Sequence, residues 1–142
     1  MDAVQDISVL DSLGNYDREN NPKGLTVQEL LPRGVSWLSG GVRHKVEHAD
    51  GLIATNLRAA NGIALVLSPF NKALNDAMIL NPDGTVMWDI SNVAWRVAPG
   101  CILTDVYYVV DELCFFIYIS GRDYRFSFDV ATGGFGKLIV SY

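Results

Sequence analysis

Residues 101–142 read CILTDVYYVVDELCFFIYISGRDYRFSFDVATGGFGKLIVSY and predict an antiparallel meander of four strands. The runs 102–110 and 113–119 are rich in Val, Ile, Tyr and Phe, which favour strands. Only Asp111-Glu112 separates the two runs, so the chain must reverse there within about two residues. These two runs are therefore expected to form a hairpin.

The rest of the meander follows from its turns and its alternation. Residues 120–123, Ser-Gly-Arg-Asp, supply a second reversal, and residues 124–130 then alternate apolar with polar side chains, as in a strand with one wet face. A third turn is predicted at 131–134 and a last strand at 137–141. The C-terminus is therefore expected to lie inside the sheet.

The middle of the chain shows similar patterns. Asp50-Gly51 and Asn61-Gly62 are strong hairpin signals, and the Asn81-Pro82-Asp83-Gly84 sequence is typical of a turn. Reversals at intervals of roughly 10 to 20 residues are typical of an antiparallel sandwich or barrel. The strands predicted in this region are 42–48, 52–58, 63–68, 77–80, 85–90 and 93–97.

Helix is expected at few places. Thr26-Val27-Gln28-Glu29 is a capping-box pattern, and Pro32 and Gly34 would end a helix that starts there. Ser68-Pro69 could start a second short helix, through Leu74. We predict one mainly β domain over 1–142, with a polar loop and a short helix in segment 1–34 and an antiparallel β core over 35–142.

Charge and composition narrow the classes of partner. The chain has 16 Asp and Glu against 11 Lys and Arg, a net charge of -5, and no basic stripe, which disfavours nucleic acid. An acidic surface suits a basic protein partner. No apolar run approaches the length of about 18 residues that a membrane span needs, and no targeting signal is recognised. Two cysteines predicted to lie about 25 Å apart favour a reducing, cytoplasmic location.

His44-Lys45-Val46-Glu47-His48 resembles the H-x-x-E-H motif of inverzincins, in which two His on a helix bind zinc. The glycines at 40, 41 and 51 leave too short a window for a stable helix. As a strand, the segment places His44 and His48 about 13 Å apart, beyond shared ligation. We therefore expect no metal site here and keep a zinc hydrolase as an alternative.

Other catalytic patterns are absent from the sequence. It has no P-loop, no Rossmann glycine pattern and no cysteine with a nearby His. A hydrolase that uses a pair of carboxylates stays open as an alternative, because the sequence does not place acids across a cleft. Residues 83–88 and 128–133 resemble hairpin fragments of β-propeller blades, but a 142-residue chain is shorter than four blades of about 40 residues.

Two segments are candidates for recognition. Strand 113–119 is apolar on both faces, which fits either a doubly covered core strand or an aromatic patch that meets a partner. Segment 14–24 is a polar loop with one Tyr and one Arg among acids and amides, which fits either a recognition loop or a flexible linker.

These observations favour a non-enzymatic inhibitor, such as a bacterial immunity protein that occludes the active site of a toxin. The alternatives are a small-molecule-binding β-barrel, its interior lined by Trp88, Trp95 and the aromatic residues of the meander, and the hydrolases named above. No catalytic residue, metal ligand or cofactor is predicted, and the oligomeric state is left open. The residues predicted to contact a basic partner are Tyr16, Asp17, Glu19, Asp111, Glu112, Phe116 and Tyr118.

Overall fold

The computed structural model describes residues 2–11 and 13–141, so Met1 and Tyr142, the last residue of the predicted meander, lie outside it. The described chain is mainly β, as predicted, with two short helices, α1 (Val27–Leu30) and α2 (Ile90–Val97). The strands are β1 (Gln5–Leu10), β2 (Gly34–Ser39), β3 (Val42–Glu47), β4 (Leu52–Asn56), β5 (Ile63–Leu67), β6 (Asp76–Leu80), β7 (Val86–Asp89), β8 (Ile102–Val109), β9 (Glu112–Ile119), β10 (Arg122–Ser127) and β11 (Ile139–Val140).

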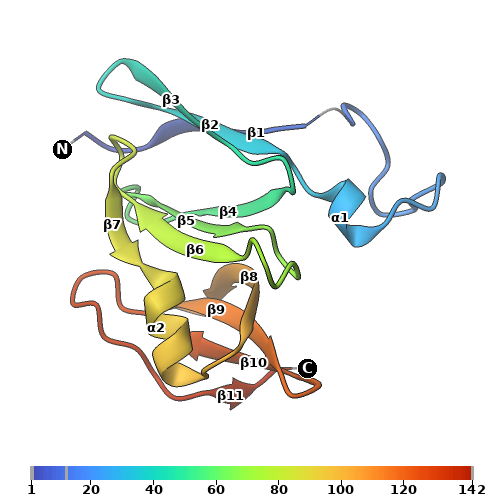
Figure 1. Cartoon of the computed structure of the whole chain (residues 1–142). Coiled ribbons are helices and arrows are strands. Elements are labelled where there is room, and N and C mark those ends of the chain that lie inside the picture. The colour runs from blue at the N-terminus through green and yellow to red at the C-terminus, as the bar shows by residue number, and fades with distance from the viewer. Residues whose placement is uncertain (1, 12, 142) are drawn as a thin grey trace.

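The strands form three antiparallel sheets that lie in layers (Figure 1). The first sheet has the order β1-β2-β3, the second β4-β5-β6-β7 and the third β11-β10-β9-β8. Each sheet has two free edges, so none closes on itself. The sandwich prediction is confirmed as a multi-sheet packing, and the barrel alternative is wrong.

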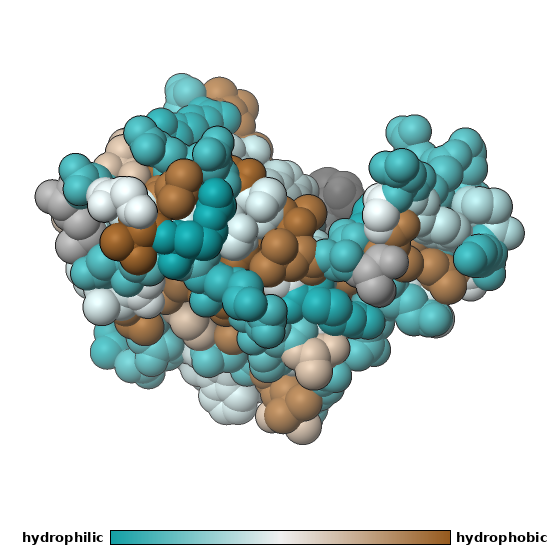
Figure 2. Space-filling model, turned by 90° about the horizontal axis from the view of Figure 1, so that it is seen from above, coloured by the Kyte–Doolittle hydropathy of each residue, from teal (hydrophilic) through white to brown (hydrophobic). Residues whose placement is uncertain are grey.

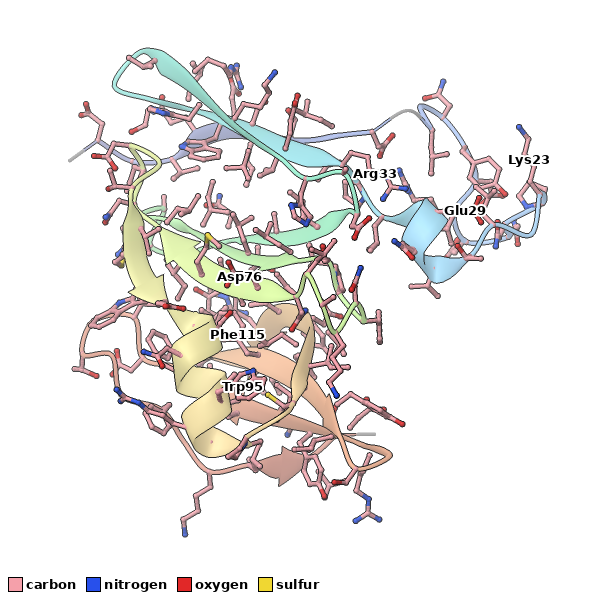
Figure 3. All side chains as sticks on the ribbon, in the orientation of Figure 1. Lys23, Glu29, Arg33, Asp76, Trp95 and Phe115 are labelled. Carbon is pink, nitrogen blue, oxygen red and sulfur yellow. The ribbon has the colours of Figure 1, made fainter. Side chains whose placement is uncertain are left out.

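The second sheet is the central layer, because its strand β5 carries buried apolar side chains on both faces. Ile63 and Leu65 pack with Trp37 in the cluster facing the first sheet. Ala64 and Val66 point the other way, into a larger cluster that contains Phe115 of the third sheet. Because successive side chains of a strand alternate between faces, a strand that is apolar at every position can contribute to two cores. Figure 3 shows Phe115 between the lower two layers.

The meander is confirmed, with one change of register. The β8–β9 turn is Val110-Asp111, because Val109 pairs with Glu112. This turn lies one residue earlier than predicted. The β9–β10 turn places Ser120 at φ 53° and Gly121 at φ 77°, positive angles that fit a tight hairpin. The predicted strand 137–141 is shorter, since only β11 pairs with β10.

Three local predictions are wrong. Residues 93–97, expected as a strand, belong to α2, whose N-cap Asp89 accepts a hydrogen bond from the N–H of Asn92. No helix follows Ser68-Pro69, because residues 68–74 form turns. Asp50-Gly51 makes no hairpin, since it links β3 of the first sheet to β4 of the second.

The N-terminal segment contains a strand as well as the predicted helix. β1 pairs with β2 and carries a register shift next to Asp6, which has φ 51°. The helix α1 has the predicted capping box, with hydrogen bonds of 3.1 Å in both directions between Thr26 and Glu29. Neither helix in the described chain is long and apolar enough to cross a membrane.

Candidate protein-binding site

Three segments of the chain line one groove of about 710 Å³. They are the loop after β4, the tip of the β8–β9 hairpin, and the chain that follows β10. We call this feature the acidic groove. Its lining residues are Leu57, Ala59, Asn61, Tyr108, Asp111, Glu112, Leu113, Ser127, Phe128, Asp129, Val130, Ala131, Thr132, Gly134, Phe135 and Gly136.

The acidic groove combines apolar surface with negative charge. Leu113 and Phe128 are buried members of the core, and Phe135 is 44% exposed. The lining also includes the carboxylates of Asp111, Glu112 and Asp129, and it includes no Lys or Arg. Such a lining can take a cationic group that carries an apolar stem.

The hairpin tip is held in an unusual backbone conformation. Val110 has φ 57°, a region that β-branched residues rarely occupy, and it is 80% exposed. Arg58 donates a hydrogen bond to the carbonyl oxygen of Val110, and its guanidinium carbon lies 4.2 Å from the ring centroid of Tyr108. The guanidinium is also 3.5 Å from the carboxylate of Asp111. Arg58 therefore ties the loop after β4 to the tip.

The segment that follows β10 is fixed by its own contacts. Asp129 Oδ1 accepts hydrogen bonds from the N–H groups of Ala131 and Thr132, at 2.9 and 3.4 Å. Trp88 Nε1 donates to the carbonyl oxygen of Val130 at 2.8 Å. Both the hairpin tip and this segment are therefore braced in the free protein.

Tyr16, Asp17 and Glu19 lie away from the groove, on an arm formed by Asp11 and residues 13–33. Figure 1 shows the arm beside the first sheet, away from the third, and Figure 2 shows it as a mostly hydrophilic projection. The Tyr16 hydroxyl donates to Asn21 Oδ1 at 2.6 Å and accepts from the N–H of Lys23, a residue at the far end of the arm (Figure 3). The loop is thus internally hydrogen-bonded, and the Tyr16 hydroxyl is already engaged.

The acids of the arm differ in their contacts. Asp17 accepts hydrogen bonds from the backbone and the side chain of Asn20, and these contacts lower the pKa of its carboxyl. Asp11 forms an ion pair with Arg18 inside the arm. Glu19 is exposed. The arm therefore offers fewer uncommitted carboxylates than its composition suggests.

Phe116 and Tyr118 lie on the outer face of the third sheet. The rings of Phe116 and Tyr107 stack with their centroids 4.2 Å apart, although Tyr107 pairs in register with Cys114. Phe116 is buried by this contact, and Tyr107 and Tyr118 are the exposed rings of the face. Beside them, burial raises the pKa of the Asp105 carboxyl.

The structure therefore divides the seven predicted contact residues among three places, the arm, the tip and this outer face. Only Asp111 and Glu112 share a groove. Asp129 and Phe135 were not predicted as partners of these acids, although the β9–β10 pairing, which places Ser127 opposite Cys114, brings the segment after β10 to the hairpin tip.

The H-x-x-E-H residues lie on β3 and at its end, as the strand interpretation predicts. His44 stacks on Trp37, with ring centroids 5.5 Å apart, and His48 Nε2 is hydrogen-bonded to Ser68 Oγ. Within residues 2–11 and 13–141, no group of three or more His, Cys, Asp or Glu side chains could hold a metal ion. Trp95, proposed for a barrel interior, is instead exposed on α2 (Figure 3).

Comparison with known proteins supports the fold. One chain of the solved structure of Tne2 in complex with Tni2 is similar to this chain, with a TM-score of 0.67 and 14% sequence identity. The match covers 98% of this chain and 99% of that chain. No family model matches the sequence, and no curated protein matches it significantly. At this identity the likeness shows a shared fold over the whole length.

Proposed function

We propose that this protein is a non-enzymatic inhibitor that binds a basic protein, in the manner of a bacterial immunity protein that neutralises a toxin in the cytoplasm. The observation that carries the proposal is the acidic groove, where the tip residues Asp111 and Glu112 stand beside an apolar floor. A protein interface commonly combines an apolar centre with a polar rim. The structural neighbour, which was solved in a complex of two proteins, supports a role in protein binding.

The groove fits this role better than hydrolysis by a carboxylate pair. A general acid usually needs a buried environment that raises its pKa. The Asp111 side chain is 93% exposed, and Asp129 Oδ1 is engaged with backbone N–H groups. Exposed carboxylates are suited to attract a partner through long-range charge.

A small molecule is the second candidate occupant. The volume of the groove falls within the range of roughly 300 to 1,000 Å³ that is common for ligand sites. The lining offers few enclosed surfaces, because the tip residues Val110 and Asp111 are highly exposed. Thermal-shift screening of metabolites against the purified protein would test this alternative, which predicts that a ligand stabilises the fold.

The inhibitor proposal is tested by capturing the partner from native cells with tagged protein and then measuring association kinetics. The association rate should fall as salt rises, because attraction between exposed charges is screened beyond a Debye length of about 8 Å at physiological ionic strength. The dissociation rate should change less.

Reversing the charge of acidic residues tests which surface of the protein binds the partner. Asp111→Lys with Glu112→Lys should slow association with a basic toxin and remove protection of cells that express it. Asp17→Lys with Glu19→Lys on the arm is the matched control, because it makes the same change of net charge. Both variants should keep their Tm within a few degrees, as surface substitutions usually do. A partner that binds both variants at the wild-type rate would contradict the proposal.

A further inference from the structure

We infer that the acidic groove binds an arginine side chain presented by a protein partner, an inference that rests on the proposed function. The charge of the groove is the first reason. Asp111, Glu112 and Asp129 contribute three carboxylates to the lining, and the lining contains no basic side chain. A cationic occupant is therefore complementary to the groove, and an anionic one is repelled.

The apolar part of the lining selects a long side chain. Leu113 and Phe128 form buried apolar surface at the groove, and Phe135 is partly exposed. The methylene groups of Arg or Lys can pack on such surface while the charged end meets the carboxylates. A volume of about 710 Å³ exceeds that of one side chain, so the groove also has room for the flanking backbone of the partner.

The hairpin tip already holds one guanidinium. The side chain of Arg58 lies over the ring of Tyr108, donates to the carbonyl oxygen of Val110 and approaches the carboxylate of Asp111. Tyr108 and Asp111 also line the groove. The free protein therefore uses a ring, a carbonyl and a carboxylate at the groove mouth to bind the chemical group that we assign to the partner.

Two carboxylates are free to receive a second guanidinium. Glu112 makes no ion pair or hydrogen bond through its side chain with any described residue. Asp129 uses Oδ1 for its turn, and its Oδ2 accepts no hydrogen bond within residues 2–11 and 13–141. Arginine fits better than lysine, because its planar group can bond a carboxylate in a bidentate manner and stack on an aromatic ring such as Phe135.

The test is a titration of the intact protein with the peptide acetyl-Gly-Arg-Arg-Gly-amide, followed by ¹H–¹⁵N NMR. We expect the amide shifts to concentrate at residues 108–113 and 127–136. The corresponding lysine peptide should bind at least about threefold more weakly, since a compact ammonium lacks the planar contacts. Shifts centred on the arm, or equal affinity for both peptides, would overturn the inference.

Two double variants distinguish binding of the peptide at a defined site from general electrostatic attraction to an acidic protein. Glu112→Gln with Asp129→Asn should weaken binding of the arginine peptide by about tenfold, because the two carboxylates that are free to receive its guanidinium lose their charge. Asp17→Asn with Glu19→Gln makes the same change in net charge and should weaken it by less than about twofold. Equal weakening by both variants would overturn the inference.

Binding measurements on the captured partner distinguish failure of the arginine-site inference from failure of the proposed function. If the arginine peptide shows no preference for the groove while the partner still binds wild-type protein with a salt-sensitive association rate, the inhibitor function stands and the arginine site falls. If no protein partner is captured but the groove binds the arginine peptide selectively, the arginine site stands and the proposed function falls.

Discussion

The side-chain amide of Asn75 forms two hydrogen bonds with the backbone of Leu103. Nδ2 donates to the Leu103 carbonyl oxygen and Oδ1 accepts from its N–H, both at 2.8 Å. Leu103 belongs to β8, an edge strand of the third sheet, whereas Asn75 immediately precedes β6 of the second sheet. The amide therefore replaces a neighbouring strand at this edge and ties two sheets together.

Replacing Asn75 with Ala should lower the free energy of unfolding by about 1 to 3 kcal/mol, because the backbone groups of Leu103 would lose their partners in a largely buried setting. Urea unfolding followed by tryptophan fluorescence would measure this change. Asn15→Ala, at an exposed position of the arm, is the control and should change stability by less than about 0.5 kcal/mol. Equal effects of the two substitutions would contradict the role of the amide.

Val110→Gly should raise the free energy of unfolding by about 1 kcal/mol, because glycine has no Cβ and adopts positive φ without the strain of a valine. Val86 is similarly exposed but lies in β7 without positive φ, so Val86→Gly should destabilise the protein. Chemical denaturation of both variants checks the sign. A loss of stability in Val110→Gly would show that the turn is not strained.

Substitutions at Gly133 and Gly121 distinguish two costs of adding a Cβ, the backbone strain at positive φ and a clash with a neighbouring side chain. Both have φ 77°, but a Cβ at Gly133 would lie 2.6 Å from the Trp88 ring, whereas at Gly121 its nearest neighbour is 4.0 Å away. Gly121→Ala should therefore cost about 1 kcal/mol for the backbone alone. Gly133→Ala should cost about 1 to 3 kcal/mol more, because the ring must move. Equal losses in differential scanning calorimetry would contradict the close packing on Trp88.

Asp105→Asn should stabilise the protein at neutral pH. Burial raises the pKa of the Asp105 carboxyl above its unfolded value, so the folded state holds the proton more tightly. The favourable contribution of the protonated form is fully present below the unfolded pKa and is lost as the pH rises through the folded pKa. The advantage of Asn over Asp should therefore be largest near pH 7 and shrink as the pH falls toward 4.

Comparing the two proteins at each pH cancels the contributions of other acids, among them Asp83, whose hydrogen bonds from Thr85 lower its pKa. Asn at position 105 can still accept the 2.8 Å hydrogen bond from the N–H of Val106. Urea midpoints from pH 4 to 7 provide the measurement. A stability difference that does not vary with pH would contradict a raised pKa at Asp105.

The short helix α2 shows where local patterns are ambiguous. Val93, Trp95 and Val97 alternate as in a strand, yet Ile90, Val93, Ala94 and Val97 also repeat with the period of a helix. Ile90 and Ala94 are buried, and Val93 and Val97 pack against the same core. The packing of this face on the second sheet favours the helix. β1 was missed for a related reason, because the irregularity near Asp6 breaks its alternation.

The sequence by itself determined the hairpins of the meander, the capping box of α1 and the strand nature of the segment around His44, because turns, caps and alternation depend on residues close together in the chain. The tertiary structure alone decided the stacking of three sheets and the position of the loop after β4 at the acidic groove. Asp111 and Asp129 come together through the β9–β10 pairing, which places Ser127 opposite Cys114. The loop after β4 reaches the groove only through the packing of the second sheet on the third, which no local pattern encodes.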